Sequence, residues 1–400
     1  MKVQIRMRMP LRVAPVVLKR GSRLARVGCM TLVMALAGCS DGGSGTAPTA
    51  AASAAGLVRG YVITNFAIAN LPSGPDVCPQ GFALTERDLF LAGLSPAQRA
   101  KDASENPDWI RRVSVDRDRP NQCSQPTAYD NPGHITLDDR AVAEGFDLDG
   151  GAANTGLRTC SHREFISSDG AQGIDNQLWR VFGCVKGYQP GSTIDEYAVA
   201  NIKSGGRTIL IEISGIDDER NDAEVQLGIY SSSDPVPLDG VGNIAANGSL
   251  QVGANKHFHT RVAGKLKDGV LTAGPIDELR LEYNGQFLKS EYQFRHAKVR
   301  LEFAADGTVE GIIGGYWDIE GFYDAHARQA TRAGALTIGY TCPGLYGALH
   351  DQADGFPDAD TGECTAISAA FRLRGVPAFV IHPDLADVAA TPSSAAGDSQ

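Results

Sequence analysis

Two acidic loops lie close together in the sequence and have the residue types of a calcium site. The first contains Asp147 and Asp149, which are followed by glycines, and the second contains Asp169, Asp175 and Asn176. Glycines permit tight turns, so carboxylates at this spacing can turn toward one point. Calcium takes about six to eight oxygen ligands from carboxylates, amides and backbone carbonyls. We expect these five residues to bind calcium, and the alternative is that they only cap a helix and form turns.

A further acidic loop precedes Cys364. Asp358 and Asp360 repeat the pattern of two carboxylates one residue apart, followed by a glycine. Such a loop can supply oxygen ligands to calcium, but the same residue types are common in solvated turns. Asp358 and Asp360 are therefore a second candidate calcium site, with a solvated turn as the alternative.

The segment 315–324, GYWDIEGFYD, has the residue types of a carbohydrate-active enzyme. Asp318 and Glu320 would share one face of a strand, and paired carboxylates are the catalytic groups of most glycoside hydrolases. Tyr316 and Trp317 offer rings for stacking on sugars, whereas packing at a sheet edge is the alternative. The motif resembles the ExDxxE core of laminarinase-type glycosidases, which fold as jelly rolls. Tyr316 or Trp317, however, stands where that family has its first glutamate.

The sequence lacks the motifs of other common enzyme classes. It contains no GxSxG, HExxH or Walker loop, no GxGxxG in a strand–helix context, and no CxxCH motif for haem attachment. The sequence therefore predicts neither a nucleotide nor a haem cofactor, and it favours binding over catalysis.

The first 39 residues have the order of a secretion signal. A basic region with eight Lys or Arg and no acid precedes a short apolar run, which ends in Leu36-Ala37-Gly38-Cys39. The apolar run is about half as long as a membrane-spanning helix requires. The last four residues resemble the lipobox of bacterial lipoproteins, which implies that Cys39 becomes the lipid-modified N-terminus. Ser40 resembles the next residue of lipoproteins directed to the outer membrane, where the protein would face the periplasm or the cell surface.

Acidic side chains dominate the rest of the chain. Beyond residue 38 the sequence has 29 Lys and Arg against 47 Asp and Glu, which gives a net charge of −18. This charge repels phosphate backbones and argues against a nucleic-acid partner. We expect the membrane, through the lipid, and small cations as partners.

Export determines the expected state of the cysteines. An even number of cysteines in an oxidising compartment predicts disulfides, and the six beyond the lipidation position are Cys78, Cys123, Cys160, Cys184, Cys342 and Cys364. Six cysteines allow fifteen connectivities. We expect sequential pairing because each bridge would then close a modest loop. A Cys160–Cys184 bridge would also fold the second acidic loop over the first.

Alternation of apolar and polar residues predicts the fold of residues 206–388. Several segments with period-two alternation are separated by turn signals such as Asn284-Gly285 and Asp306-Gly307. This pattern is typical of antiparallel strands with one buried face. Such strands in succession predict a mainly β fold, and we expect an antiparallel β-sandwich or jelly roll.

The remaining residues divide into segments of different composition. Residues 1–38 are the expected lipoprotein signal, 39–56 a flexible tether, and 389–400 a disordered tail, because small residues cannot build a core. Residues 57–205 are expected to be irregular and braced by disulfides. They would open with one strand and contain short helices, one of them over residues 94–103 with Ser95 as its cap.

These features together predict a lipoprotein of the cell envelope. The expected function is binding by a calcium-stabilised module, whose ligand would be a glycan or another envelope component. One alternative is a glycoside hydrolase that uses Asp318 and Glu320. Another is a structural envelope protein without a ligand.

Overall fold

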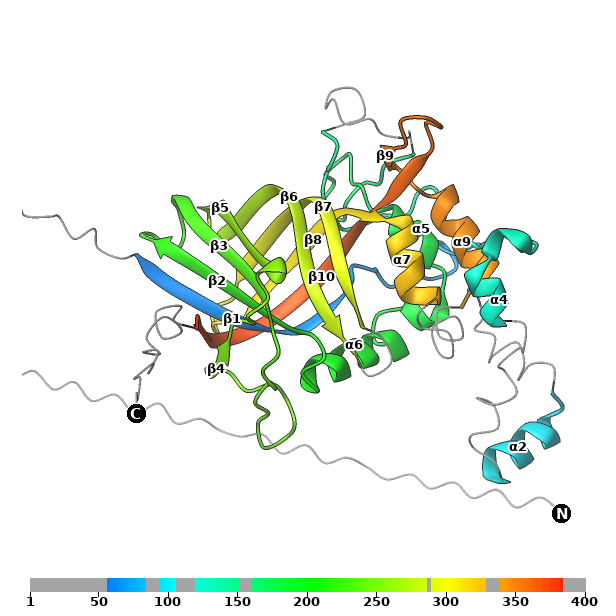
Figure 1. Cartoon of the computed structure of the whole chain (residues 1–400), viewed down its shortest axis with the longest axis horizontal. Coiled ribbons are helices and arrows are strands. Elements are labelled where there is room, and N and C mark those ends of the chain that lie inside the picture. Colours follow the sequence, from blue (N-terminus) through cyan, green and yellow to red (C-terminus); the bar gives the residue numbers. More distant parts are fainter. Residues whose placement is uncertain are drawn as a thin grey trace, which may run out of the picture. The chain divides into compact units, whose positions relative to one another are not determined.

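Eight of the ten strands in the sheet form a closed antiparallel barrel in the computed structural model (Figure 1). The structure describes residues 56–83, 94–105, 119–150, 160, 162–285, 289–328 and 339–383. The first and last barrel strands, β1 and β10, pair with each other and close the ring. The barrel strands in ring order are β1 (Leu57–Ile68), β2 (Thr208–Ile216), β3 (Asp222–Ser232), β5 (His259–Lys267), β6 (Val270–Asn284), β7 (Lys289–Phe303), β8 (Val309–Asp318) and β10 (Cys364–Ile381).

Two short strands extend the sheet along β10. β9 (Gly355–Pro357) pairs antiparallel with the beginning of β10, and β4 (Gly248–Gln251) pairs parallel with its end. Leu250 of β4 belongs to the same hydrophobic cluster as Leu210 and Tyr230.

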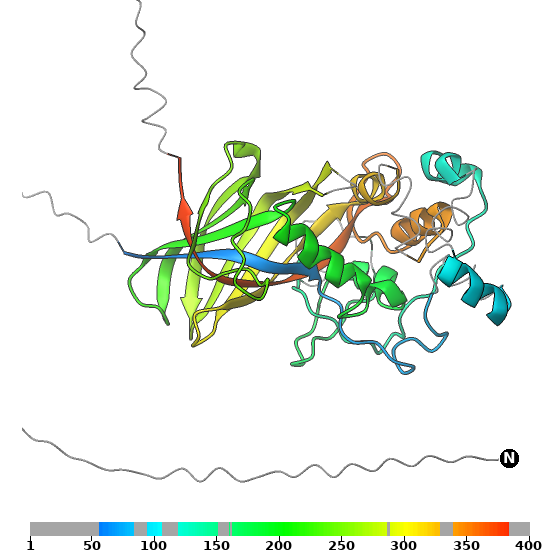
Figure 2. The same cartoon turned by 90° about the horizontal axis from the view of Figure 1, so that it is seen from below.

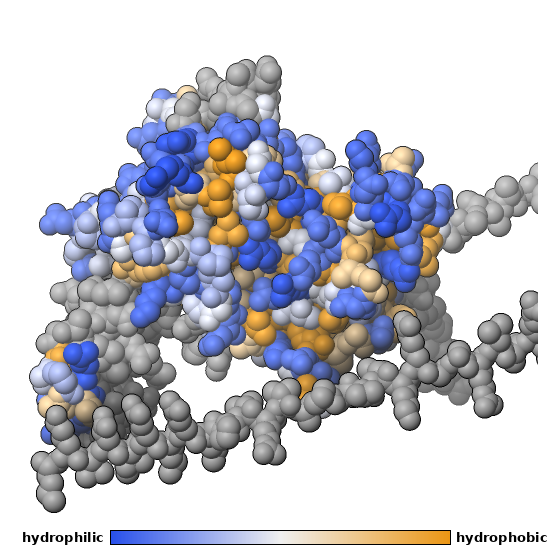
Figure 3. Space-filling view, turned by 180° about the vertical axis from the view of Figure 1, so that it is seen from behind, coloured by the Kyte–Doolittle hydropathy of each residue, from blue (hydrophilic) through white to orange (hydrophobic). Residues whose placement is uncertain are grey.

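The register of the strands explains the alternating sequence pattern. Tyr61 lies beside Ile211, and Ile211 lies beside Ile229, so these side chains point to the same side of the sheet. Leu279 and Leu281 of β6 are likewise buried. Apolar areas on the surface are scattered among polar ones when the molecule is viewed from behind (Figure 3). The predicted antiparallel strands and the mainly β fold are confirmed.

The interior of the barrel is filled by aromatic side chains in the half where β1 ends and β10 begins. The ring centroids of Phe371 and Phe66 are 5.1 Å apart, and those of Phe371 and Phe294 are 5.3 Å apart. Trp317 lies 4.8 Å from Tyr292 by the same measure. An eight-stranded barrel is just wide enough to be filled by side chains, and here large rings fill it.

The barrel replaces the expected two-sheet sandwich. Both architectures bury one face of each strand, so alternation alone does not distinguish them. Residues 57–68, which the sequence assigns to the irregular region, form β1 and lie in the ring. The pairing of β1 with β10 therefore makes one closed sheet out of the predicted strands.

Helices gather at the end of the barrel where β1 ends and β10 begins, which we call the helical end (Figures 1 and 2). The oxygen Oγ of Ser95 accepts a hydrogen bond from the Gln98 backbone N–H at 3.2 Å, as the predicted cap requires. Among the described residues, no helix is both long and apolar enough to span a bilayer. The helical segments are α2 (Pro96–Glu105), α4 (Arg119–Ser124), η1 (Pro126–Ala128), α5 (Gln177–Phe182), η2 (Lys186–Tyr188), α6 (Thr193–Lys203), η3 (Lys256–Phe258), α7 (Ile319–Tyr323), η4 (Asp324–Arg328) and α9 (Cys342–Asp351).

Three disulfides confirm that all six cysteines form bridges. The expected sequential pairing is wrong, because the bridges are Cys78–Cys184, Cys123–Cys342 and Cys160–Cys364. Their partners are separated by 106, 219 and 204 residues. The fold brings distant segments together at the helical end, where α4 and α9 contact each other. The cysteines therefore pair with residues that are close in the tertiary structure and not in the sequence.

Candidate metal centre

Asp175 lies against the loop formed by residues 146–150 and is hydrogen-bonded to its backbone. Its backbone N–H donates to the Phe146 carbonyl at 2.8 Å, and its Oδ2 accepts hydrogen bonds from the N–H groups of Leu148 at 2.6 Å and Asp149 at 3.3 Å. The first acidic loop thus wraps around a carboxylate of the second. The two loops meet as expected, but hydrogen bonds of the Asp175 backbone and carboxylate hold them, and not a Cys160–Cys184 bridge.

Three carboxylates converge at this point. Oxygen atoms of Asp147, Asp149 and Asp175 lie within 4.8 Å of one another. Asp149 and Asp175 are buried, with 4% and 5% of each residue exposed. The Oδ1 atom of Asp149 is buried without a hydrogen-bond partner. A buried carboxylate oxygen without a partner costs free energy, and a cation at the cluster would remove this cost.

Burial and mutual repulsion raise the affinity of this region for protons. Burial raises the pKa of Asp175 to about 7, with a further contribution from the charges of Asp149 and Asp147. Burial also raises the pKa of Asp354 to about 8, and the charge of Asp175 adds to the effect. The pKa of Tyr316 is raised as well, first by burial and then by the nearby carboxylates. The cluster therefore attracts either protons or a cation near neutral pH.

Asp354 also belongs to this region, although the sequence does not predict it as a site residue. It lies just before β9, and its Oδ1 accepts a hydrogen bond from the Ser368 backbone N–H at 2.6 Å. The Ser368 hydroxyl in turn accepts from the Gln177 N–H at 2.9 Å, at the start of α5. The signal in the sequence was a single acid between Ala353 and Gly355, and nothing in it showed that the chain returns to the first acidic loop.

Asp169 lies in an exposed turn outside this cluster, and Asn176 directly precedes α5. Asp169 accepts hydrogen bonds from the Ser167 hydroxyl and from the Ala171 N–H in an exposed turn, and these bonds lower its pKa. Asn176 precedes α5, and its amide Nδ2 donates to the Glu144 carbonyl at 2.9 Å. The Asn176 Oδ1 is buried without a partner. Of the four expected carboxylates, Asp147, Asp149 and Asp175 thus lie in the cluster.

The second candidate loop forms a turn in which its own backbone N–H groups donate hydrogen bonds to the carboxylate of Asp358. The Asp358 Oδ1 accepts hydrogen bonds from the N–H groups of Asp360 at 3.0 Å and Thr361 at 2.9 Å. The backbone hydrogen bonds from Thr361 and Asp360 lower the pKa of Asp358. This geometry is that of a turn closed by an aspartate side chain.

Asp318 and Glu320 do not alternate along one strand. Asp318 ends β8 and caps α7 by accepting a hydrogen bond from the Gly321 N–H at 2.8 Å, whereas Glu320 lies within α7. Glu320 pairs with Arg328 at 3.0 Å. Burial raises the pKa of Glu320, but hydrogen bonds from Tyr346 and Arg328 outweigh it and leave the pKa lowered. A general acid in a glycoside hydrolase needs a raised pKa.

Tyr316 and Trp317 lie in the core and not at the surface. Only 2% of each residue is exposed. The indole ring of Trp317 contacts the rings of Phe294 and Phe371 inside the barrel. Tyr316 packs against Phe356 near the acidic cluster. The rings therefore cannot form the expected ligand platform, because neighbouring side chains already cover them.

The donor set of the cluster selects a hard cation. It offers carboxylate oxygens alone, whereas the common zinc sites include histidine nitrogen or cysteine sulfur. Calcium accepts an irregular shell of carboxylates, carbonyls and water, while magnesium is seldom held by a cage made of protein alone.

Comparison of the chain with protein families, with curated proteins and with solved structures finds no match. The function is therefore inferred from the side chains themselves.

Proposed function

We propose that this chain is a calcium-stabilised binding module of the cell envelope, attached to the outer membrane through lipid on Cys39. The lipobox-like sequence Leu36–Cys39 supports the attachment. The three disulfides support an oxidising compartment, because such bridges are rare in reducing ones. In that compartment the protein would face the periplasm or the cell surface.

The observation that carries the calcium proposal is the buried, unpartnered oxygen of Asp149 beside the carboxylates of Asp147 and Asp175. An ion there would join the loop of residues 146–150 to the segment that enters α5. Asp354, whose pKa responds to the charge of Asp175, connects the same region to β10 through Ser368. Calcium would thus stabilise the helical end of the barrel.

We expect calcium to raise the melting temperature of the wild-type protein. Calcium that binds only the folded state at one hundred times its dissociation constant stabilises it by about 2.7 kcal/mol. Asp149→Asn should abolish this effect because it removes a charged ligand without changing the shape of the side chain. The measurement is thermal unfolding in calcium, in magnesium and in EGTA.

Asp358→Asn is the matched control. It makes the same chemical change in the second candidate loop, and the calcium effect should persist in it. The EGTA-treated Asp149→Asn protein should be at least as stable as the wild type in EGTA, since the substitution removes repulsion between carboxylates. A calcium effect that persists in Asp149→Asn, or is lost in Asp358→Asn, would contradict the proposed site.

The calcium effect should increase with pH. Between the ordinary aspartate pKa of 3.8 and pH 7, the folded state holds a proton on Asp175, whose pKa burial raises to about 7, while the unfolded chain has lost it. The ion-free protein therefore loses stability as the pH rises through that value, whereas calcium replaces the proton. Calcium affinity should rise by up to about tenfold per pH unit below the pKa. Thermal unfolding at pH 6, 7 and 8 measures this, and an effect independent of pH would argue against proton release.

The other expectations from the sequence have less support. The glycan ligand depended on Tyr316 and Trp317, which are buried. The glycoside hydrolase depended on Asp318 and Glu320, which have separate structural partners. A purely structural role differs from calcium binding in predicting no effect of the ion, so the same unfolding experiment distinguishes them.

A further inference from the structure

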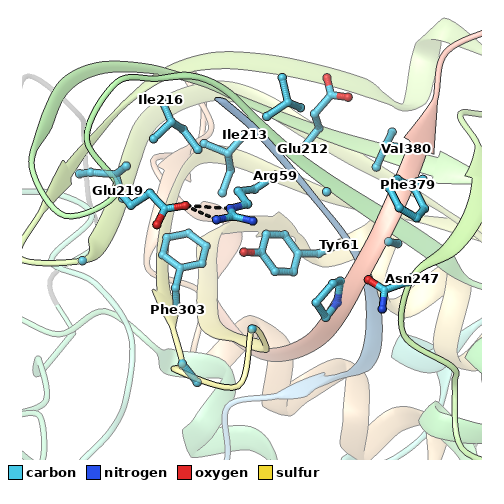
Figure 4. Close-up of a pocket in the computed structure, with 18 of the residues that line it drawn as sticks. Arg59, Tyr61, Glu212, Ile213, Ile216, Glu219, Asn247, Phe303, Phe379 and Val380 are labelled. Atoms are coloured by element: carbon cyan, nitrogen blue, oxygen red, sulfur yellow. Dashed lines mark hydrogen bonds and ion pairs between the residues drawn. The ribbon is translucent and has the colours of Figure 1, made fainter. Parts of the chain in front are cut away.

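The end of the barrel where β1 begins and β10 ends, which we call the open end, contains a cavity of about 660 Å³ (Figure 4). Figures 1 and 2 show this end opposite the helical end. The aromatic rings fill the interior toward the helical end. The cavity lies within the range of about 300–1,000 Å³ that is typical of small-molecule sites. Its lining includes residues of β1, β2, β5, β7 and β10.

Apolar and aromatic side chains form much of the lining. The rings of Tyr61 and Phe303 are stacked with centroids 5.8 Å apart. Ile213 and Leu266 contribute aliphatic side chains from neighbouring parts of the ring. Phe379, with 61% of its surface exposed, adds an aromatic ring from the end of β10. These side chains provide contacts for the apolar part of a ligand.

An ion pair lies in the lining of this opening. The Arg59 Nε donates to the Glu219 Oε1 at 3.0 Å, and Arg59 Nη2 donates to the same oxygen. Figure 4 shows the two side chains pointing toward each other. Their side chains are 50% and 57% exposed, so water screens the pair and it contributes little to stability. Arg59 alternates with the buried residues Tyr61 and Ile63 along β1, so its side chain points to the same side of the sheet as theirs.

The lining contains two arginines and two glutamates, and an anionic group of a ligand would bind at the guanidinium of Arg59. Arg220 is a second guanidinium in the lining. Of the two glutamates there, Glu212 already pairs with His382 at 2.9 Å, and only Glu219 pairs with Arg59. Glu219 lies between β2 and β3, outside both strands. A ligand carboxylate can therefore take its place on the fork of Arg59, which matches a carboxylate in shape and charge.

We propose that the open end of the barrel binds a small amphipathic carboxylate, whose charge replaces Glu219 on Arg59 and whose apolar body contacts Tyr61 and Phe303. This site rests on the proposed function only in assuming that the chain is a binding module. It is separate from the acidic cluster, which lies at the helical end. Calcium binding and ligand binding can therefore fail independently.

The test is calorimetric titration of the full protein with decanoate, decylammonium and decanol below their aggregation concentrations. Decanoate should bind most tightly. Arg59→Gln should weaken decanoate binding at least about tenfold, since it removes a charge-assisted pair. Glu219→Gln should strengthen it, because the internal competitor for Arg59 is lost. Each titration is made in calcium and in EGTA, alongside thermal unfolding that reports calcium binding separately.

Arg374→Gln is the matched control. Arg374 also forms an exposed pair on a barrel strand, with Glu310 at 3.0 Å, but it does not belong to the lining. This variant should bind decanoate like the wild type. No binding of decanoate, tighter binding of decylammonium, or equal effects of Arg59→Gln and Arg374→Gln would overturn the proposal.

Discussion

Phe371→Ala is expected to lower the free energy of unfolding by about 3–5 kcal/mol. Phe371 is 3% exposed, and its ring lies between 5.1 and 5.9 Å from those of Phe66, Phe294, Tyr292 and Trp317 by centroid distance. Removing the ring leaves a cavity inside the barrel that its neighbours cannot fill, because they are held on three different strands, β1, β7 and β8. Urea denaturation at a fixed calcium concentration measures the loss.

Phe379→Ala makes the same substitution further along β10, where the side chain is 61% exposed. Its effect on the free energy of unfolding should stay within about 0.5 kcal/mol, as for most surface substitutions. Similar losses for the two variants would contradict the inward orientation of Phe371. The pair therefore tests the register of β10 as well as the packing of the core.

Loss of the Cys78–Cys184 bridge is expected to lower the free energy of unfolding by about as much as Phe371→Ala does. The bridge closes a loop of 106 residues, and release of the chain entropy in the unfolded state corresponds to about 4–5 kcal/mol. Both cysteines are buried in a cluster with Trp179 and Phe165, so the double variant Cys78→Ala/Cys184→Ala also loses core contacts. Urea denaturation of this variant under oxidising conditions gives the magnitude.

Dithiothreitol on the wild type provides the comparison for this variant. It opens all three bridges, so its effect should be at least as large as that of the double variant. A loss below about 1 kcal/mol in the variant would contradict the bridge as a major source of stability. A larger effect of the variant than of full reduction would point to packing of the cysteines and not to the covalent link.

The sequence predicts the strands well because alternation depends on local burial. Leu279 and Leu281 alternate with polar residues, and both lie in the core. Closure of the sheet depends on the pairing of β1 with β10, which no local pattern records. The disulfide connectivity cannot be predicted from local patterns for the same reason. Cys123 is bridged to Cys342 across 219 residues, and only the complete fold determines that contact.

The candidate metal centre was predicted in part for a similar reason. Asp147 and Asp149 are near Asp175 in the sequence, and a loop can bring such neighbours together. Asp354 comes from a distant segment and was not included. Trp317 looked like a surface residue beside two acids, but its position on β8 directs the ring into the barrel. Carboxylate spacing therefore identified the loops, whereas the direction of each side chain required the tertiary structure.

Because β1 pairs with β10, the barrel can close only when β10 is present. Tyr61 pairs with Pro377, roughly 300 residues later, so the ring remains an open ribbon until the last strand has been synthesised. Such distant pairing slows folding. A chain truncated before β10 would expose the unpaired edges of β1 and β8, which are templates for joining other chains. A shortened product should therefore accumulate as aggregates and not as a smaller soluble barrel.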